Sequence, residues 1–135
     1  MKREGLSAIL GFHGNPGMIK SLEEGLEYRD YTRIDVAKTP EEMLKKCQTH
    51  QYDAYVMDLN LGYPNTDNFI VTKRIREMEQ DRIEKGKVKF FPITANDAVV
   101  ETAKREGIPE AMTKSEFNRL YFKQHILGKP KDLEE

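Results

Sequence analysis

Apolar residues along the chain fall into two alternating patterns, short runs and longer stripes with helical spacing. The short runs predict five strands, and the stretches between them repeat apolar residues every three or four positions, which predicts helices. The expected strands are Ser7–Phe12, Tyr31–Ala37, Tyr52–Asp58, Val88–Thr94 and Ala111–Thr113. Strands that alternate with helices favour an open parallel sheet with helices on both faces and right-handed crossovers.

The helix after the second strand carries the strongest start signal in the chain. Thr39 is a typical N-cap, Pro40 suits the first helical position, and Glu42 is placed to complete a capping box. Cys47 lies on the apolar stripe of this helix, where a free cysteine is usually a small buried hydrophobe. We therefore expect a well-formed helix that packs Cys47 against the sheet.

A longer helix is expected after the turn-rich segment that follows Asp58. Val71, Ile75 and Met78 have the spacing of one buried face, and Gly86 is the expected end of the helix. The many charges between residues 77 and 89 predict a solvent-exposed surface with no further role.

The last helix is expected from about Ser115, with that serine as its cap. It should bury Phe117, one of Leu120 and Tyr121, and Leu127. No internal repeat or linker interrupts the pattern, so residues 1–128 are interpreted as a single domain and residues 129–135 as a flexible C-terminal tail.

Composition narrows the class of protein. The 135 residues include 22 Lys and Arg against 23 Asp and Glu, a formal net charge of −1, so bulk charge attracts the chain neither to nucleic acid nor to membranes. No apolar run is long enough to span a bilayer, and no signal peptide precedes the first strand. One cysteine excludes an internal disulfide. We expect a cytoplasmic protein of a reducing compartment, without nucleic-acid or membrane partners.

Three reactive side chains stand at the ends of predicted strands. Asp58, Thr94 and Lys114 all come at or just after a strand end, and parallel strands place these ends on one edge of the sheet. A carboxylate can accept a phosphoryl group, an ammonium can neutralise its oxygens, and a hydroxyl can hydrogen-bond the new charge. Taken one at a time, each residue has a structural explanation: a turn cap, a strand former and a solvated lysine.

The sequence stretches around these three residues indicate that the residues act together. The stretches "YDAYVMDLNL", "PITAND" and "GIPEAMTKS" resemble three blocks of the response-regulator receiver domain, over residues 7–127 and in the family's order. The resemblance implies a flavodoxin-like sheet with strand order 2-1-3-4-5. It implies that Asp58 is the phosphoacceptor, Thr94 the switch hydroxyl and Lys114 the phosphoryl-contacting lysine. It also implies that the backbone carbonyl of Asn60 helps to ligate a metal ion.

The sequence departs from the family where receivers hold Mg²⁺. When Pro16 is aligned with the family's proline, His13 and Gly14 occupy the positions of two acidic residues that follow the first strand. Mg²⁺ is usually held by carboxylates, so a site left with Asp58 and a carbonyl should bind it weakly, and phosphoryl transfer should be slow. A direct ion pair between Asp58 and Lys114 can instead fix the site without phosphate.

Three other positions also differ from what the family or the fold leads us to expect. Ala111 stands where the family often has an aromatic residue, so the usual movement of a ring after the switch hydroxyl is absent. Ser115 replaces a proline that commonly follows the lysine. Pro92 lies in a strand that should be internal, where it removes one ladder donor unless it stands at a bulge or near the strand end.

Three functions remain open at this point. The first is a stand-alone atypical receiver in phosphorelay signalling, phosphorylated at Asp58 by a histidine kinase or phosphotransfer protein and docking a downstream protein through the face of its last two helices. The second is a phosphorylation-independent pseudo-receiver that serves as a binding module. The third, a small α/β nucleotide-binding enzyme, is disfavoured because "GFHGNPG" lacks the lysine and spacing of a phosphate loop. Under the first two functions the chain is not an enzyme beyond self-phosphorylation.

Overall fold

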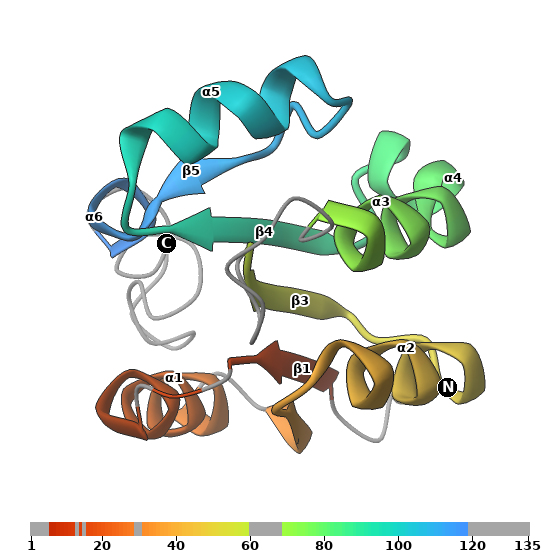
Figure 1. The fold of residues 1–135 in the computed structure, drawn as a ribbon. Helices are drawn as coiled ribbons and strands as arrows, with labels where there is room; N and C mark the ends of the chain where they lie inside the picture. Colours follow the sequence, from red (N-terminus) through yellow and green to blue (C-terminus); the bar gives the residue numbers. More distant parts are fainter. Residues whose placement is uncertain (1–5, 13, 15, 29–30, 60–68, 119–135) are drawn as a thin grey trace, which may run out of the picture.

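The computed structural model describes residues 6–12, 14, 16–28, 31–59 and 69–118. Its five strands are β1 (Leu6–Gly11), β2 (Tyr31–Ala37), β3 (Ala54–Asp58), β4 (Lys89–Thr94) and β5 (Met112–Thr113). They pair in parallel in the order β2-β1-β3-β4-β5 (Figure 1). The predicted fold class and strand order are therefore confirmed, although β3 begins two residues later than expected.

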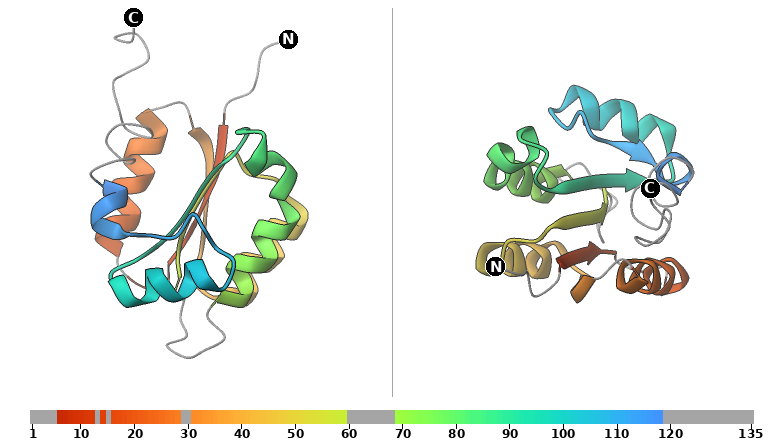
Figure 2. Two further views of the ribbon diagram at one scale, coloured as in Figure 1. Left: turned by 90° about the horizontal axis from the view of Figure 1, so that it is seen from above. Right: turned by 180° about the vertical axis from the view of Figure 1, so that it is seen from behind.

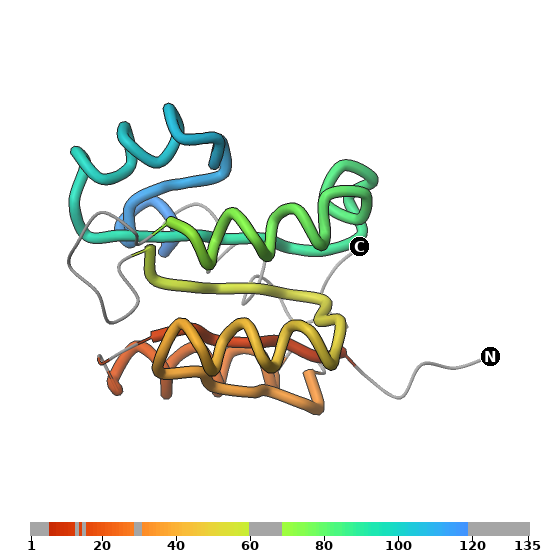
Figure 3. The backbone as a smooth tube through the Cα atoms, turned by 45° about the vertical axis from the view of Figure 1, so that its right-hand side comes forward, coloured from red at the N-terminus to blue at the C-terminus, as the bar shows by residue number. Residues whose placement is uncertain are grey.

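Helices cover both faces of the sheet. They are α1 (Pro16–Tyr28), α2 (Pro40–Thr49), α3 (Phe69–Met78), α4 (Gln80–Glu84), α5 (Asp97–Arg105) and α6 (Lys114–Glu116). One core cluster joins α1 to the sheet through Leu22 and Leu26, and another joins α2 and α3 to its other face through Met43 and Ile75. Figure 2 shows α1 and α6 on one side of the sheet and α2 and α3 on the other. In Figure 3 the chain can be followed from each of the first four strands through a helix to the next strand.

The inner strand β1, between β2 and β3, is buried on both faces. Ala8 and Leu10 pack in the cluster on the α1 side, whereas Ile9 packs on the α2 side, as an inner strand of a parallel sheet requires. Gly11 lets α2 approach closely, because a Cβ at this position would lie 2.9 Å from the Sδ atom of Met43. The carboxyl end of β1 therefore packs closely against α2, at the same end of the sheet as the candidate site residues.

The helix that follows Asp58 differs from the expected one. It ends at Met78, whose side chain is 41% exposed, and not at Gly86, which follows the separate α4 and has a φ of +69°. Glu79, between the two helices, is only 2% exposed, so the prediction of a purely solvated charge run was wrong at this residue. Its burial is possible because its carboxylate accepts hydrogen bonds from Tyr55 and Arg82.

The helix caps agree only in part with the predicted ones. Thr39 caps α2 by accepting a hydrogen bond from the Glu42 N–H (3.1 Å), but the Glu42 carboxylate bonds the N–H of Lys38, one residue before the cap. The cap of α6 is Thr113 and not Ser115 as expected, because Thr113 and Glu116 form a reciprocal capping box. Phe117 is fully buried as predicted, while the other expected core positions of the last helix and residues 129–135 lie outside the described residues.

Pro92 is tolerated in β4 because its backbone nitrogen does not point toward a strand that needs its hydrogen bond. The Ile93 carbonyl accepts a hydrogen bond from Leu59 N–H (2.8 Å), so Ile93 faces the β3 side and its neighbour Pro92 faces the β5 side. The ladder with β5 begins only at the Ile93–Met112 pair. The missing N–H of Pro92 therefore costs no ladder bond.

Candidate functional site

The strand register brings Asp58, Thr94 and Lys114 to one edge of the sheet. Asp58 is the last residue of β3 and pairs with Ile93, the neighbour of Thr94. Thr94 ends β4 and pairs with Thr113, the neighbour of Lys114. Three residues far apart in the sequence thus become successive neighbours across the sheet, as the analysis of strand ends predicts.

Asp58 and Lys114 form a direct ion pair. The Lys114 Nζ atom lies 3.3 Å from Oδ2 of Asp58, and the two side chains are 24% and 22% exposed. The same Nζ atom lies 5.9 Å from the centre of the Phe12 ring, within range of a cation–π contact with that buried residue. The expected direct ion pair of Asp58 with Lys114 is confirmed as geometry.

Thr94 brings a buried hydroxyl to the same edge. It is fully buried, and its Oγ1 atom accepts a hydrogen bond from the Asn96 N–H at 3.3 Å. Asn96 in turn caps α5 by accepting a bond from the Ala98 N–H at 2.8 Å. A threonine hydroxyl that accepts one bond can still donate another. The turn after β4 therefore holds the threonine side chain through its oxygen, and this bond does not use the hydroxyl hydrogen.

The family model of the response regulator receiver domain matches residues 13–123 of the chain. The chain belongs to this family. No curated protein matches the chain significantly. The helices described in this receiver domain are all too short or too polar to cross a membrane.

Solved receiver structures share its fold. The receiver domain of the sensor histidine kinase PA1611 from Pseudomonas aeruginosa PAO1, solved with a coordinated magnesium ion, is 24% identical over 93% of this chain and 99% of its own, with a TM-score of 0.62. A response regulator from Burkholderia pseudomallei, with a phosphorylated aspartic acid and a calcium ion, is 20% identical over 81% of this chain, with a TM-score of 0.62, and this chain spans 59% of it. A putative response regulator from Chloroflexus aurantiacus is 19% identical over 93% of this chain and all of its own (TM-score 0.61).

The donor atoms that the described residues bring to this edge of the receiver domain fit Mg²⁺ poorly. Gly14, which stands in one of the two acidic positions, offers no side chain, while His13 and Asn60 lie outside the described residues. Within the described part of the chain, no three His, Cys, Asp or Glu side chains gather where they could hold a metal ion. Lys114 already places a cation beside Asp58. A single carboxylate paired with a lysine is a weak starting set for an ion that requires several oxygen ligands.

The position next to β5 carries no ring. Ala111 is 3% exposed and packs in a small cluster, whose other buried members are Leu59, Val100, Ala103 and Ile108. The side chain at this position is a methyl group enclosed by aliphatic neighbours, so it has no ring that could swing between two positions. Any response to a change at Thr94 must be carried by other groups in this receiver domain.

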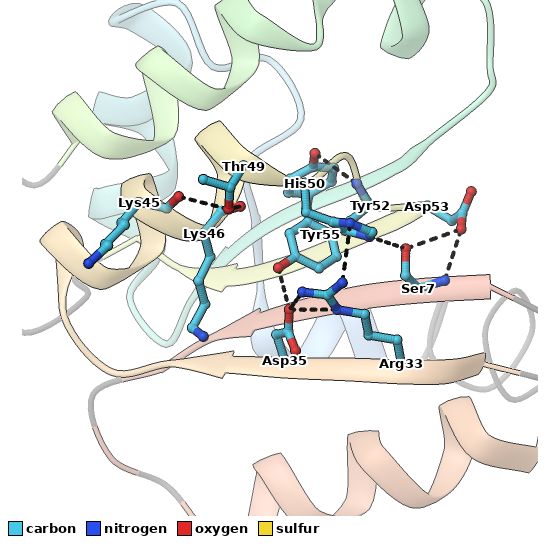
Figure 4. A network of polar contacts seen from close by, with 10 residues as sticks. All are labelled: Ser7, Arg33, Asp35, Lys45, Lys46, Thr49, His50, Tyr52, Asp53 and Tyr55. Atoms are coloured by element: carbon cyan, nitrogen blue, oxygen red, sulfur yellow. Dashed lines mark hydrogen bonds and ion pairs between the residues drawn. The ribbon is translucent and has the colours of Figure 1, made fainter.

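A polar network at the opposite edge of the sheet escaped the analysis of the sequence. We call it the amino-edge network, and its members are Ser7, Arg33, Asp35, His50, Tyr52, Asp53, Tyr55, Glu79 and Arg82. Figure 4 shows all of these residues except Glu79 and Arg82. The network gathers around the start of β3, and its side chains bond chiefly one another. No short motif marks these residues, because they come from β1, β2, the α2–β3 loop, β3, the α3–α4 junction and α4.

The first half of the amino-edge network centres on Asp35 and His50. The Asp35 carboxylate accepts a short hydrogen bond from the Tyr52 hydroxyl and pairs with Arg33 at 3.1 Å. The Arg33 guanidinium has only donors and lies 3.4 Å from His50 Nδ1, so this nitrogen accepts, and Nε2–H of the neutral ring can donate to Ser7 Oγ at 3.2 Å. Burial acts to raise the pKa of Asp35, but the bonds from Tyr52 and Arg33 outweigh it, and the pKa lies below its usual value.

The second half centres on the buried Glu79. Its carboxylate accepts hydrogen bonds from the Tyr55 hydroxyl at 2.5 Å and from Arg82 at 2.7 Å, and Arg82 also donates to the Tyr52 carbonyl at 2.9 Å. Burial, followed by the bond to Glu79, raises the pKa of Tyr55. Burial, with a contribution from the Glu79 charge, also raises the pKa of Cys47 to about 12, so this thiol is protonated and unreactive as a buried hydrophobe should be.

Proposed function

We propose that this receiver domain accepts a phosphoryl group on Asp58 and signals by docking a partner protein. In the step, a carboxylate oxygen of Asp58 forms a bond to phosphorus, the bond to the donor's leaving group breaks, and the leaving group takes the electron pair. A histidine kinase or a phosphotransfer protein is the natural donor for this family. The observation that supports the proposal is the ion pair between Asp58 and Lys114 at the carboxyl edge of the sheet.

Lys114 and Thr94 are proposed to assist Asp58. The Lys114 ammonium, 3.3 Å from the carboxylate, can follow the charge onto the new phosphoryl oxygens and neutralise part of it. The buried Thr94 hydroxyl, one residue beyond the pairing partner of Asp58, can donate a hydrogen bond to the same group. Output then passes to a protein that docks on the face formed by the last two helices, in the reducing cytoplasm that the single buried thiol suits.

A phosphorylation-independent binding module is the second candidate function, and two observations favour it. Gly14 supplies no carboxylate in a metal-binding position, and Lys114 already places a cation beside Asp58, where a metal ion would otherwise lie. Under this alternative the pair holds the edge in one fixed state, and partner binding does not change when a phosphodonor is added.

Intact-mass spectrometry after incubation with a small acyl phosphodonor tests the proposal. With Mg²⁺, or with Mn²⁺ as a substitute, we expect slow addition of one phosphoryl group, which is lost in Asp58→Asn. Asp81→Asn is the matched control, because Asp81 is an exposed carboxylate that pairs with Lys85. Modification that persists in Asp58→Asn contradicts the assignment of Asp58, and no modification with either metal ion favours the binding module.

A further inference from the structure

The Lys114 ammonium has a second neighbour besides Asp58, the ring of Phe12. Within the described part of the chain, its Nζ atom lies 3.3 Å from the Asp58 carboxylate and, over the Phe12 ring, 5.9 Å from the ring centre. The face of an aromatic ring carries partial negative charge and attracts a cation out to about 6 Å. The ammonium therefore has an attractive partner in addition to the carboxylate.

Phe12 is held rigidly beside the candidate site. It follows β1 directly, and its N–H donates a hydrogen bond to the Ala37 carbonyl of β2 at 3.0 Å. Its side chain is fully buried in the core cluster on the α1 side of the sheet, which also contains Phe117. Close packing of this kind keeps a ring in one position. Phe12 can thus provide a fixed surface for a flexible lysine side chain.

Lys114 needs such a surface because only its backbone is well restrained. It is the first residue of α6, directly after Thr113, whose capping box with Glu116 fixes the backbone at this point. The ammonium stands at the end of a flexible stem, and holding that stem in one conformation costs rotamer entropy. A partly exposed ion pair with Asp58 is a weak restraint by itself.

We propose that Phe12 is a positioning residue, whose ring holds the Lys114 ammonium beside Asp58 through a cation–π contact. This inference rests on the proposed function and adds a residue to the same site. With the ring face in place, the ammonium stays where it can neutralise the oxygens of an incoming phosphoryl group. When the attraction is weakened, the ammonium turns more often toward solvent. Because 5.9 Å is near the outer limit of the interaction, its effect lies at the small end of the known range.

A simpler account is that the stem of Lys114 packs on the Phe12 ring as on any apolar surface. Lysine stems commonly cover apolar groups in this way while the charge stays in water. Apolar packing requires the shape of the ring, whereas a cation–π contact requires the negative charge of its face. Phe12→Leu cannot separate the two accounts, because it changes the shape and leaves a space in the core. Ring fluorination can separate them, since fluorine withdraws electrons from the ring face and changes the ring size only slightly.

Phenylalanine with one, two or three ring fluorines, incorporated at position 12 of the full chain, tests the proposal. The measured quantity is the unfolding equilibrium constant in urea, in the parent sequence and in Lys114→Gln. Fluorination also changes the hydrophobicity of the ring, and the Lys114→Gln background measures that effect alone. We expect three fluorines to raise the unfolding constant about twofold to threefold more in the parent sequence than in Lys114→Gln, with smaller differences for fewer fluorines.

Two further measurements complete the test. The same fluorinated residues at Phe90, which is buried on the α2 side of the sheet, should have effects that do not depend on Lys114. The rate of phosphoryl addition from a small phosphodonor should fall about twofold with three fluorines at position 12, and should not depend on the ring in Lys114→Gln. A purely structural role of Phe12 predicts equal changes in both backgrounds.

Equal effects of fluorination on stability in the two backgrounds would overturn the inference. A phosphorylation rate that stays constant or rises as fluorines are added would also overturn it. These outcomes are distinct from a failure of the proposed function. If the stability difference is present but no variant is phosphorylated, Phe12 still places Lys114, and only the role of Asp58 as phosphoacceptor is rejected. If Asp58 is phosphorylated and the stability effects are equal, only the role of Phe12 is rejected.

Discussion

The two edges of the sheet use polar side chains in different ways. At the amino edge, the carboxylate of Glu79 is 2% exposed and is bonded by Tyr55 and Arg82, and Asp35 is bonded by Tyr52 and Arg33. At the carboxyl edge, Asp58 and Lys114 form a longer contact of 3.3 Å, and both remain more than a fifth exposed. The amino edge has the properties of a structural network, and the carboxyl edge those of a site that can exchange partners.

The comparison explains why the edge with the larger number of polar contacts is not the edge that we propose as the functional site. Breaking hydrogen bonds between buried polar groups costs free energy, and groups that already satisfy one another have few donors or acceptors left for a ligand. A partly exposed pair is weak in stability terms and can open when a better partner for either charge arrives. We therefore expect substitutions at the two edges to affect different properties, stability at the amino edge and reactivity at the carboxyl edge.

The largest expected effect on stability is at Glu79. Glu79→Ala removes the acceptor of two hydrogen bonds and leaves Tyr55 and Arg82 without their buried partner, which should cost about 3 kcal/mol of the free energy of unfolding. Urea unfolding followed by circular dichroism measures it. Glu77→Ala, two residues earlier on an exposed face of α3, is the control and should cost less than about 0.5 kcal/mol. Equal losses of unfolding free energy in the two variants would contradict the assignment of a structural network to the amino edge.

A smaller and pH-dependent effect is expected at Asp35. Because its pKa in the folded state lies below the unfolded value of about 3.9, Asp35 stabilises the fold above that pH and loses its contribution as the pH falls through the folded pKa. Asp35→Asn should therefore lower stability by about 1–2 kcal/mol at pH 7, with the difference from the parent chain shrinking below about pH 4. Unfolding curves between pH 2.5 and 7 measure this, and a difference that grows toward low pH would have the wrong sign.

The smallest effect on stability is expected at the carboxyl edge. Lys114→Gln removes a partly exposed ion pair and should change the free energy of unfolding by less than about 1 kcal/mol, while it slows phosphorylation of Asp58. Urea unfolding and the rate of mass addition from a phosphodonor test the two parts on one preparation. A loss as large as that of Glu79→Ala would mean that the pair is structural.

The sequence predicts the sheet and its carboxyl edge well. Both depend on the apolar pattern of each strand and on the parallel connection between strands. The apolar runs around Leu10 and Val56 define inner strands, and the strand ends then place Asp58, Thr94 and Lys114 together without any knowledge of side-chain contacts. The resemblance to receiver domains rests on the same segments, and the family match confirms it.

What the sequence leaves out is the long-range pairing of polar groups. Glu79 lies in a run of charges and looks exposed, and the hydrogen bonds that it accepts from Tyr55 of β3 and from Arg82 make its burial favourable. Met78 has the spacing of a buried position but becomes exposed because the helix ends there. Thr113 and Ser115 are both good caps by residue type, and the reciprocal bond to Glu116 decides for Thr113.

Restoring the two absent acidic residues tests the central claim most directly. The claim is that the sheet places Asp58 correctly as a phosphoacceptor and that its reactivity is limited by the residues at positions 13 and 14. In the double variant His13→Asp, Gly14→Asp, Mg²⁺ can regain its carboxylate ligands, so phosphorylation by a small phosphodonor should become at least about 100-fold faster than in the parent chain. This gain should vanish when Asp58→Asn is added. A folded double variant that is labelled no faster than the parent, or is labelled equally without Asp58, would contradict the account.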